Sequence, residues 1–290
     1  MQYRAWQLLS LLVQRLPLRL SYAAASAIGT LAFACWPRGR RATIRNFTRV
    51  LPGATPAQVR TVARRSLANY CRYLVDFARF PVLDQGNVLA SVTGDDSFRA
   101  LDAVLAKGKG AIIVCMHFGN WDLGAAAATA RGYPMTVVAE TFRDHRLDRA
   151  IVGARKRLGM TVIKMEKVGP SLVRSLRGNG LLALLIDRPV PGDGVKVEFF
   201  GQEVEVPAGP ARLALRTGAA LVPVAFARFR PGRPEVTTLA DFGISWEPTG
   251  VEDADIRALT RSVMSSHEHY IRAYPEQWYM FREMWPAISR

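Results

Sequence analysis

Short apolar runs alternate with helical patterns from residue 97 onward, and this alternation most constrains what the chain can fold into. The runs have the length and the β-branched content of buried strands, whereas the segments between them carry apolar residues at helical spacing. The candidate strands are residues 111–116, 135–139, 160–165, 181–187 and 221–227. The pattern predicts an α/β fold with a central, mostly parallel sheet flanked by helices. The chain has 290 residues, of which 49% are hydrophobic, so it can bury a large core around such a sheet.

Other segments are predicted from the same kind of pattern. Residues 195–199 and 203–206 flank Gly201 and predict a β-hairpin whose tip could border a binding cleft. Residues 56–75 and 252–274 place apolar positions at helical spacing and predict amphipathic helices. The aromatic tail from Trp278 either closes the core or anchors the chain at an interface, and core closure is the favoured interpretation.

The charge of the chain is concentrated near its beginning. The formal net charge is +15, and residues 1–80 hold thirteen arginines and a single acid, Asp76, which gives +12 of that total. A basic surface of this kind suits nucleic acid or anionic lipid equally well. The apolar neighbours of these arginines favour lipid.

Those neighbours are two apolar runs, residues 6–13 and 20–36, separated by Arg15, Pro17 and Arg19. The second run is free of charge and has about the minimum length for crossing a bilayer. A full span, a helix lying in the membrane interface and a helix packed on the domain all remain open. Arginines after residue 36 favour a cytoplasmic flank. We therefore divide the chain into a membrane-associated segment, residues 1–45, and a domain over residues 46–290 that faces the cytoplasm at the inner membrane.

A histidine and an aspartate follow the first candidate strand as His117-Phe-Gly-Asn-Trp-Asp122, and a small-residue helix over 123–130 comes next. Ligands of open α/β sheets bind outside the carboxyl ends of the strands. A carboxylate there can hold one imidazole nitrogen and leave the other free to take a proton from a hydroxyl. For an isolated His-x4-Asp, a core histidine beside an N-capping aspartate is the better interpretation. The wider pattern of motifs favours a catalytic site.

That wider pattern is an ordered series of polar motifs along nearly the whole chain. They are Arg45-Asn46-Phe47, Arg72-Tyr73, His117-x4-Asp122, Glu140-Thr-Phe-Arg143, Arg155-Lys-Arg-Leu-Gly159, Asp187-Arg188, Val195-Lys-Val-Glu198-Phe-Phe-Gly201, residues 207–214 and Pro275-Glu-Gln-Trp278. The order and spacing resemble the bacterial lipid A biosynthesis late acyltransferase family, including its phosphatidylinositol mannoside acyltransferase branch. Asp187-Arg188 and Glu140 are closer to the mannoside branch.

The resemblance implies a glycerolipid acyltransferase-like domain that transfers a fatty acyl chain from acyl-CoA or acyl carrier protein to a hydroxyl of a membrane glycolipid, either a phosphatidylinositol mannoside or a lipid A precursor. His117 would act as the general base, and Asp122 would fix its tautomer. Arg155 could polarise the thioester carbonyl, and Arg143 could bind a phosphate. The remaining substrate-binding candidates are Glu140, Asp187, Arg188 and Glu198.

No metal or redox cofactor is expected, because His267 and His269, two apart on a helix, do not share a face and no glycine motif has the spacing of a phosphate loop. The expected partners are anionic lipids, the acyl donor and the glycolipid acceptor; no nucleic-acid motif is present. Three widely spaced cysteines indicate a reducing compartment. Two rival functions stay open: an acyl thioesterase using the same His-Asp pair, and a non-catalytic basic membrane-binding protein.

Overall fold

The structure, a computed structural model, describes residues 2–167, 169–190, 192, 194–228, 236–240, 244 and 248–285. Its α-helices are α1 (Gln2–Arg15), α2 (Leu18–Cys35), α3 (Pro37–Val50), α4 (Pro56–Arg79), α5 (Gln85–Ser91), α6 (Asp95–Leu105), α7 (Trp121–Ala130), α8 (His145–Arg157), α9 (Pro170–Arg177), α10 (Gly209–Thr217) and α11 (Glu252–Ala273). The short 3₁₀ helices are η1 (Phe80–Val82), η2 (Met165–Lys167) and η3 (Pro275–Gln277). The strands are β1 (Val92–Thr93), β2 (Ala111–Cys115), β3 (Met135–Ala139), β4 (Thr161–Lys164), β5 (Leu181–Leu185), β6 (Val195–Phe199), β7 (Gln202–Val206), β8 (Ala220–Ala227) and β9 (Val236–Ala240).

The central sheet has the strand order β1-β9-β8-β2-β5-β3-β4. The five strands from β8 to β4 run parallel to one another, and they are the five candidate strands of the sequence. The α/β prediction with a mostly parallel sheet is therefore confirmed. Strand β9 pairs antiparallel with β8, and β1 adds two residues at the edge. Strands β1 and β9 were not predicted; β1 has only two residues, too few to leave a periodic signal in the sequence.

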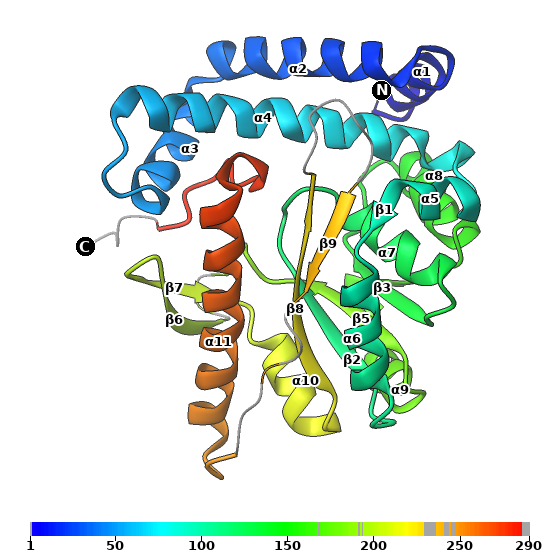
Figure 1. The fold of residues 1–290 in the computed structure, drawn as a ribbon, viewed down its shortest axis with the longest axis vertical. Helices are drawn as coiled ribbons and strands as arrows, with labels where there is room; N and C mark the ends of the chain where they lie inside the picture. Colours follow the sequence, from blue (N-terminus) through cyan, green and yellow to red (C-terminus); the bar gives the residue numbers. More distant parts are fainter. Residues whose placement is uncertain are drawn as a thin grey trace.

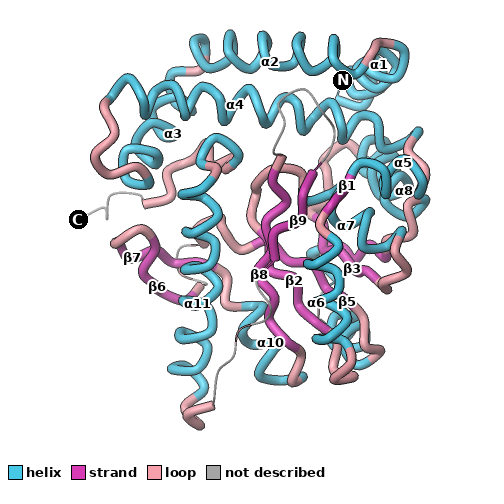
Figure 2. The backbone as a smooth tube through the Cα atoms, viewed as in Figure 1, coloured by secondary structure: helices cyan, strands magenta, loops and turns pink. Residues whose placement is uncertain are grey.

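Helices cover both faces of the sheet (Figures 1 and 2). Alternate residues of β2 point to opposite faces: Ile112 and Val114 join the core beneath α9, α10 and α11, and Ile113 and Cys115 join the core beneath α6, α7 and α8. Because both faces are buried, the strand is apolar throughout. Strands β6 and β7 form the predicted hairpin in a separate two-stranded sheet, which packs beside α11.

Helix α2 lies along α4 above the central sheet (Figure 1). The buried face of α2 is formed by Ser21, Tyr22, Ala25, Gly29 and Phe33. A Cβ at Gly29 would lie 2.7 Å from the Cα of Ala68 on α4, so glycine permits the close approach of the two backbones. The sequence left three placements of this apolar run open, and the structure packs one of its faces on the domain.

The aromatic tail closes the core on the same side of the molecule. Trp278 is fully buried and Tyr279 is nearly so. Phe118 and Trp278 form an isolated antiparallel bridge, which brings the tail next to the residues that follow β2. Core closure, the favoured interpretation of this segment, is confirmed for these two aromatic side chains.

Candidate active site

Two neighbouring parallel strands bring a histidine and an aspartate together at the carboxyl edge of the sheet. Strand β2 pairs with β5 in a register that sets Cys115 opposite Leu185. In both segments the polar residue comes two positions after the last strand residue: His117 follows β2, and Asp187 follows β5. Equal overhangs on adjacent strands therefore place both side chains at the same point of the edge, where open α/β sheets bind ligands.

The carboxylate of Asp187 holds His117 at two points. Its Oδ1 lies 2.7 Å from the imidazole Nδ1, and its Oδ2 accepts the backbone N–H of His117 at 3.0 Å. The indole Nε1–H of Trp278 donates to the same Oδ2 at 3.0 Å. With Nδ1 bonded to a carboxylate, the proton of the neutral imidazole resides there and Nε2 is left as the basic nitrogen. The His117 side chain keeps 16% of its surface exposed, so the site is open to a reactant.

Asp187 is ionised in this arrangement although it is fully buried. Burial raises its pKa, but the electrostatic interaction with His117, the hydrogen bonds from the His117 side chain and backbone, and the bond from Trp278 lower it by more. The pKa of Asp187 therefore lies below the ordinary value for aspartate. A carboxylate that stays charged is what an imidazole needs in order to carry a positive charge during a reaction.

Asp122 does not hold the imidazole, which corrects the sequence prediction. Its carboxylate accepts two hydrogen bonds from Arg155, from Nε at 2.9 Å and from Nη2 at 3.2 Å, and one from the hydroxyl of Tyr73 at 2.8 Å. The first turn of α7 directs Asp122 toward α8 and α4, whereas the carboxylate bonded to His117 comes from β5. Sequence spacing made Asp122 the nearest candidate, but the pairing of β2 with β5 decided the partner.

The guanidinium of Arg155 is held in a buried ion pair with Asp122. Only 13% of its side chain and 4% of that of Asp122 are exposed. Burial lowers the pKa of Arg155, but the charge of Asp122 raises it by more, with a smaller contribution from Tyr73. The structure thus gives Arg155 a role in holding the helix start that follows His117.

Glu140 and Arg188 meet at the same edge of the sheet. They follow β3 and β5, which are neighbours, and Arg188 Nη1 lies 3.8 Å from Glu140 Oε1. The pair is loose and partly solvated, so both side chains can turn toward a ligand. Asp187, which was predicted to contact substrate, is fully buried and reaches a reactant only through His117.

The other two predicted substrate-binding residues lie apart from this pair. Arg143 is exposed in the loop before α8 and has no hydrogen-bond or ion-pair partner among the described residues. Glu198 on β6 pairs with Arg261 of α11 at 3.7 Å, and both side chains are more than half exposed. Neither residue is bonded to the His117 and Asp187 pair in the described part of the chain.

Cys115 is buried in β2, and burial raises the pKa of its thiol, so it packs and does not act as a thiolate. Within the described ranges there is no group of three or more His, Cys, Asp or Glu side chains that could hold a metal ion.

Sequence reasoning missed several polar residues behind the site. Tyr73 and Asp76 are buried on α4, and Arg228, whose side chain is 9% exposed, follows β8; all three are far from His117 in the sequence. Tyr73 and Trp278 did fall inside motifs of the series, which could have marked them. Asp76 carried a signal too, as the only acid among the first 80 residues.

Comparison with known proteins agrees with the motif series. The profile described as bacterial lipid A biosynthesis acyltransferase matches residues 4–286. The chain belongs to this acyltransferase family. It is 33% identical over 256 residues to the phosphatidylinositol mannoside acyltransferase of Mycolicibacterium smegmatis, which covers 84% of this chain and 78% of that protein. A protein of the same name from Mycobacterium tuberculosis is 32% identical over 252 residues, with 84% and 76% coverage.

The resemblance inferred from the motifs is therefore confirmed, and the protein is an acyltransferase. At the carboxyl edge of its sheet, this acyltransferase holds the bonded pair of His117 and buried Asp187.

Proposed function

We propose that this acyltransferase moves a fatty acyl chain from an acyl-CoA or acyl carrier protein thioester to a hydroxyl of a membrane glycolipid. The observation that carries the proposal is the bond between His117 Nδ1 and buried Asp187 at 2.7 Å, at the open edge of the sheet. The names of the curated relatives favour an acceptor of the phosphatidylinositol mannoside type over a lipid A precursor.

The reaction follows from this pair. His117 Nε2 removes the proton of the acceptor hydroxyl, and the oxygen attacks the carbonyl carbon of the thioester. The tetrahedral intermediate then collapses, the carbon–sulfur bond breaks, and the imidazolium returns its proton to the leaving thiolate. Asp187 stabilises the imidazolium in between. Asp122 and Arg155 act behind the site, where they hold the start of α7.

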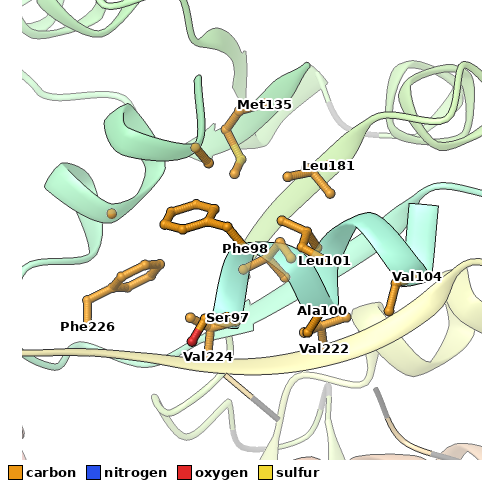
Figure 3. Close-up of a pocket in the computed structure, with 13 residues that line it drawn as sticks. Ser97, Phe98, Ala100, Leu101, Val104, Met135, Leu181, Val222, Val224 and Phe226 are labelled. Atoms are coloured by element: carbon orange, nitrogen blue, oxygen red, sulfur yellow. The ribbon is translucent and has the colours of Figure 1, made fainter. Parts of the chain in front are cut away.

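A small apolar pocket beneath α6 is the candidate site for the acyl chain of the donor. It lies between α6 and the sheet and is lined by side chains such as Phe98, Leu101, Met135 and Phe226 (Figure 3). The backbone carbonyl of Phe226, which lines the pocket, accepts the N–H of Asn120 in the loop that carries His117. Its volume of about 30 Å³ admits about two water molecules, so an acyl chain would have to displace the side chains of α6.

The amino-terminal helices suit attachment to a membrane. Helix α2 is the one described helix that is long and apolar enough to cross a bilayer. Because one face packs on α4, we infer that α2 lies in the interface of the inner membrane and does not span it. Its outer face presents Leu20, Ile28 and Leu31, which are 59%, 63% and 66% exposed, and α1 adds exposed leucines. Arginines flank both helices and can bind anionic headgroups.

The test is transfer of a labelled acyl chain from acyl-CoA to a phosphatidylinositol mannoside dispersed in detergent. His117→Ala should reduce formation of labelled lipid by at least about 10²- to 10⁴-fold, the usual loss when a positioned base is removed. His145→Ala removes an exposed histidine at the start of α8 and serves as the matched control. Labelled free fatty acid without labelled lipid would instead identify a thioesterase, and equal activity of the two variants would reject His117 as the base.

A further inference from the structure

Asp76 of α4 is a buried carboxylate that the reaction proposed above does not use. It is 5% exposed and accepts hydrogen bonds from three separate parts of the chain. The donors are the hydroxyl of Tyr22 on α2, the side-chain amide of Asn120 at 2.9 Å, and the guanidinium of Arg228 after β8. Asp76 therefore joins the membrane-facing helix to the residues around His117.

Asn120 is the point at which this carboxylate reaches the catalytic loop, residues 117–120. It is fully buried, and its side-chain oxygen accepts the N–H of Leu123 at 3.1 Å, which caps α7. With the oxygen committed to the cap, the amide nitrogen needs an acceptor of its own, which Asp76 supplies. The bond to Asp76 thus fixes the orientation of the residue that starts α7 and ends the loop.

Arg228 gives Asp76 a second route to the same loop. Its backbone N–H and carbonyl bond to the side chain of Gln277 at 2.6 Å and 2.7 Å, and the backbone carbonyl of Gln277 accepts the N–H of Gly119 at 3.0 Å. The backbone of the loop is tightly packed at Gly119. A Cβ on Gly119 would lie 1.7 Å from the carbonyl oxygen of Phe226, and the residue has a φ of 56°.

Tyr22 is the third donor to Asp76 and belongs to α2, the helix with the exposed apolar face. Its ring is buried against α4, while the opposite face of α2 carries the exposed apolar stripe. Burial raises the pKa of Asp76, although Arg228 and the hydrogen bonds from Tyr22 and Asn120 act in the other direction. The carboxylate of Asp76 therefore relies on its three donors to offset its burial, and removing the hydroxyl of Tyr22 leaves it with two.

We propose that Tyr22 is a positioning residue of the acyltransfer reaction, acting through Asp76 and Asn120, so that the seating of α2 on α4 sets the geometry of the catalytic loop. The proposal rests on the function proposed above for His117. It goes further in making the helix that meets the membrane a part of the active site's support.

The test compares Tyr22→Phe with Tyr133→Phe in the full chain. Tyr133 also donates its hydroxyl to an aspartate, Asp102 at 2.6 Å, but this bond is exposed and lies beside α6, so the control removes a tyrosine–aspartate bond away from the catalytic loop. We expect Tyr22→Phe to lower kcat about 5- to 100-fold with KM for both substrates unchanged, because a 1 Å displacement of a catalytic group costs up to about 100-fold. Hydrogen exchange at the amides of residues 119–123 should quicken, and binding to vesicles containing anionic lipid should match the wild type.

Three results decide the matter. Equal kcat and equal exchange in the two variants would overturn the proposal, and so would a loss of activity explained entirely by weaker vesicle binding. If the wild-type protein transfers no acyl chain at all, the proposed function fails by itself, and the exchange measurement, which needs no activity, then tests the link between α2 and the loop. Should Tyr22→Phe not fold, Asp76→Asn tests the same link, with faster exchange at Asn120 expected.

Discussion

Changing Asp187 to asparagine should remove the catalytic base while leaving its ring in place. Oδ2 accepts two N–H groups, from the His117 backbone and from Trp278, whereas Oδ1 faces only His117 Nδ1. An asparagine at this position therefore places its oxygen at the Oδ2 site and its NH₂ toward Nδ1. The amide then donates to Nδ1, the imidazole proton moves to Nε2, and no basic nitrogen faces the acceptor.

The expected loss is large. The same exchange behind the histidine of a Ser-His-Asp triad lowers kcat about 10⁴-fold through the wrong tautomer, which corresponds to about 5 kcal/mol of activation free energy. For Asp187→Asn we expect a loss of about 10³- to 10⁴-fold. The free energy of unfolding should change by only about 1–3 kcal/mol, because the amide still accepts the two N–H bonds.

Asp122→Asn provides the comparison, since sequence spacing assigned the same role to Asp122. This change leaves the His117 bond intact but removes the charge opposite buried Arg155, so it should lower stability more and kcat less than Asp187→Asn. Both variants would be measured by steady-state release of CoA thiol and by urea unfolding. If Asp122→Asn lost the greater share of kcat while staying folded, the assignment of Asp187 as the partner of His117 would be refuted.

Four further predictions follow from the geometry. Arg155→Lys keeps a charge beside Asp122 but loses two-point bonding, so urea unfolding should show a loss of about 1–3 kcal/mol together with a lower kcat. Ala100→Phe fills the pocket beside α6 and should shift donor preference to shorter acyl-CoA, measured as a ratio of kcat/KM values; an unchanged preference would place the acyl chain elsewhere. Leu31→Glu should weaken vesicle binding, and high salt should release the wild type only partly, because screening leaves the apolar contribution. The folded pKa of Asp187 lies below its unfolded value of about 3.9, so its stabilisation is present above about pH 4 and is lost as pH falls through the folded pKa; acid unfolding of Asp187→Asn should lack this component.

The sequence predicted the parallel sheet because each strand carries its own signal. Residues 111–116 and 181–186 are apolar throughout, as strands buried on both faces must be, and the motif at His117 marks the edge at which ligands bind. Which strands become neighbours depends on contacts between segments far apart in the chain. The pairing of β2 with β5 lies in no local pattern, and for that reason His117 was assigned the aspartate five positions away and not the one 70 positions away.

The buried polar network was beyond prediction for a related reason. Asp76 sits in a helix whose arginines alternate with apolar residues, and its sequence pattern resembles that of a solvated helix. Only the packing of α2 on one side and of the catalytic loop on the other gives its carboxylate three donors. Local spacing identifies candidate residues, while tertiary packing assigns their partners.

The bridge between Phe118 and Trp278 bears on the order in which the active site forms during synthesis. Three bonds at the site come from the segment 277–279, which is synthesised after the whole sheet. The indole of Trp278 donates to Asp187, the backbone N–H of Tyr279 donates to the carbonyl of His117, and the backbone carbonyl of Gln277 accepts the N–H of Gly119. During synthesis, the strands can leave the ribosome and pair while His117 still lacks these supports. A nascent chain would then hold a folded sheet while His117 still lacks these bonds, and the site would be complete only once the segment from residue 275 docks.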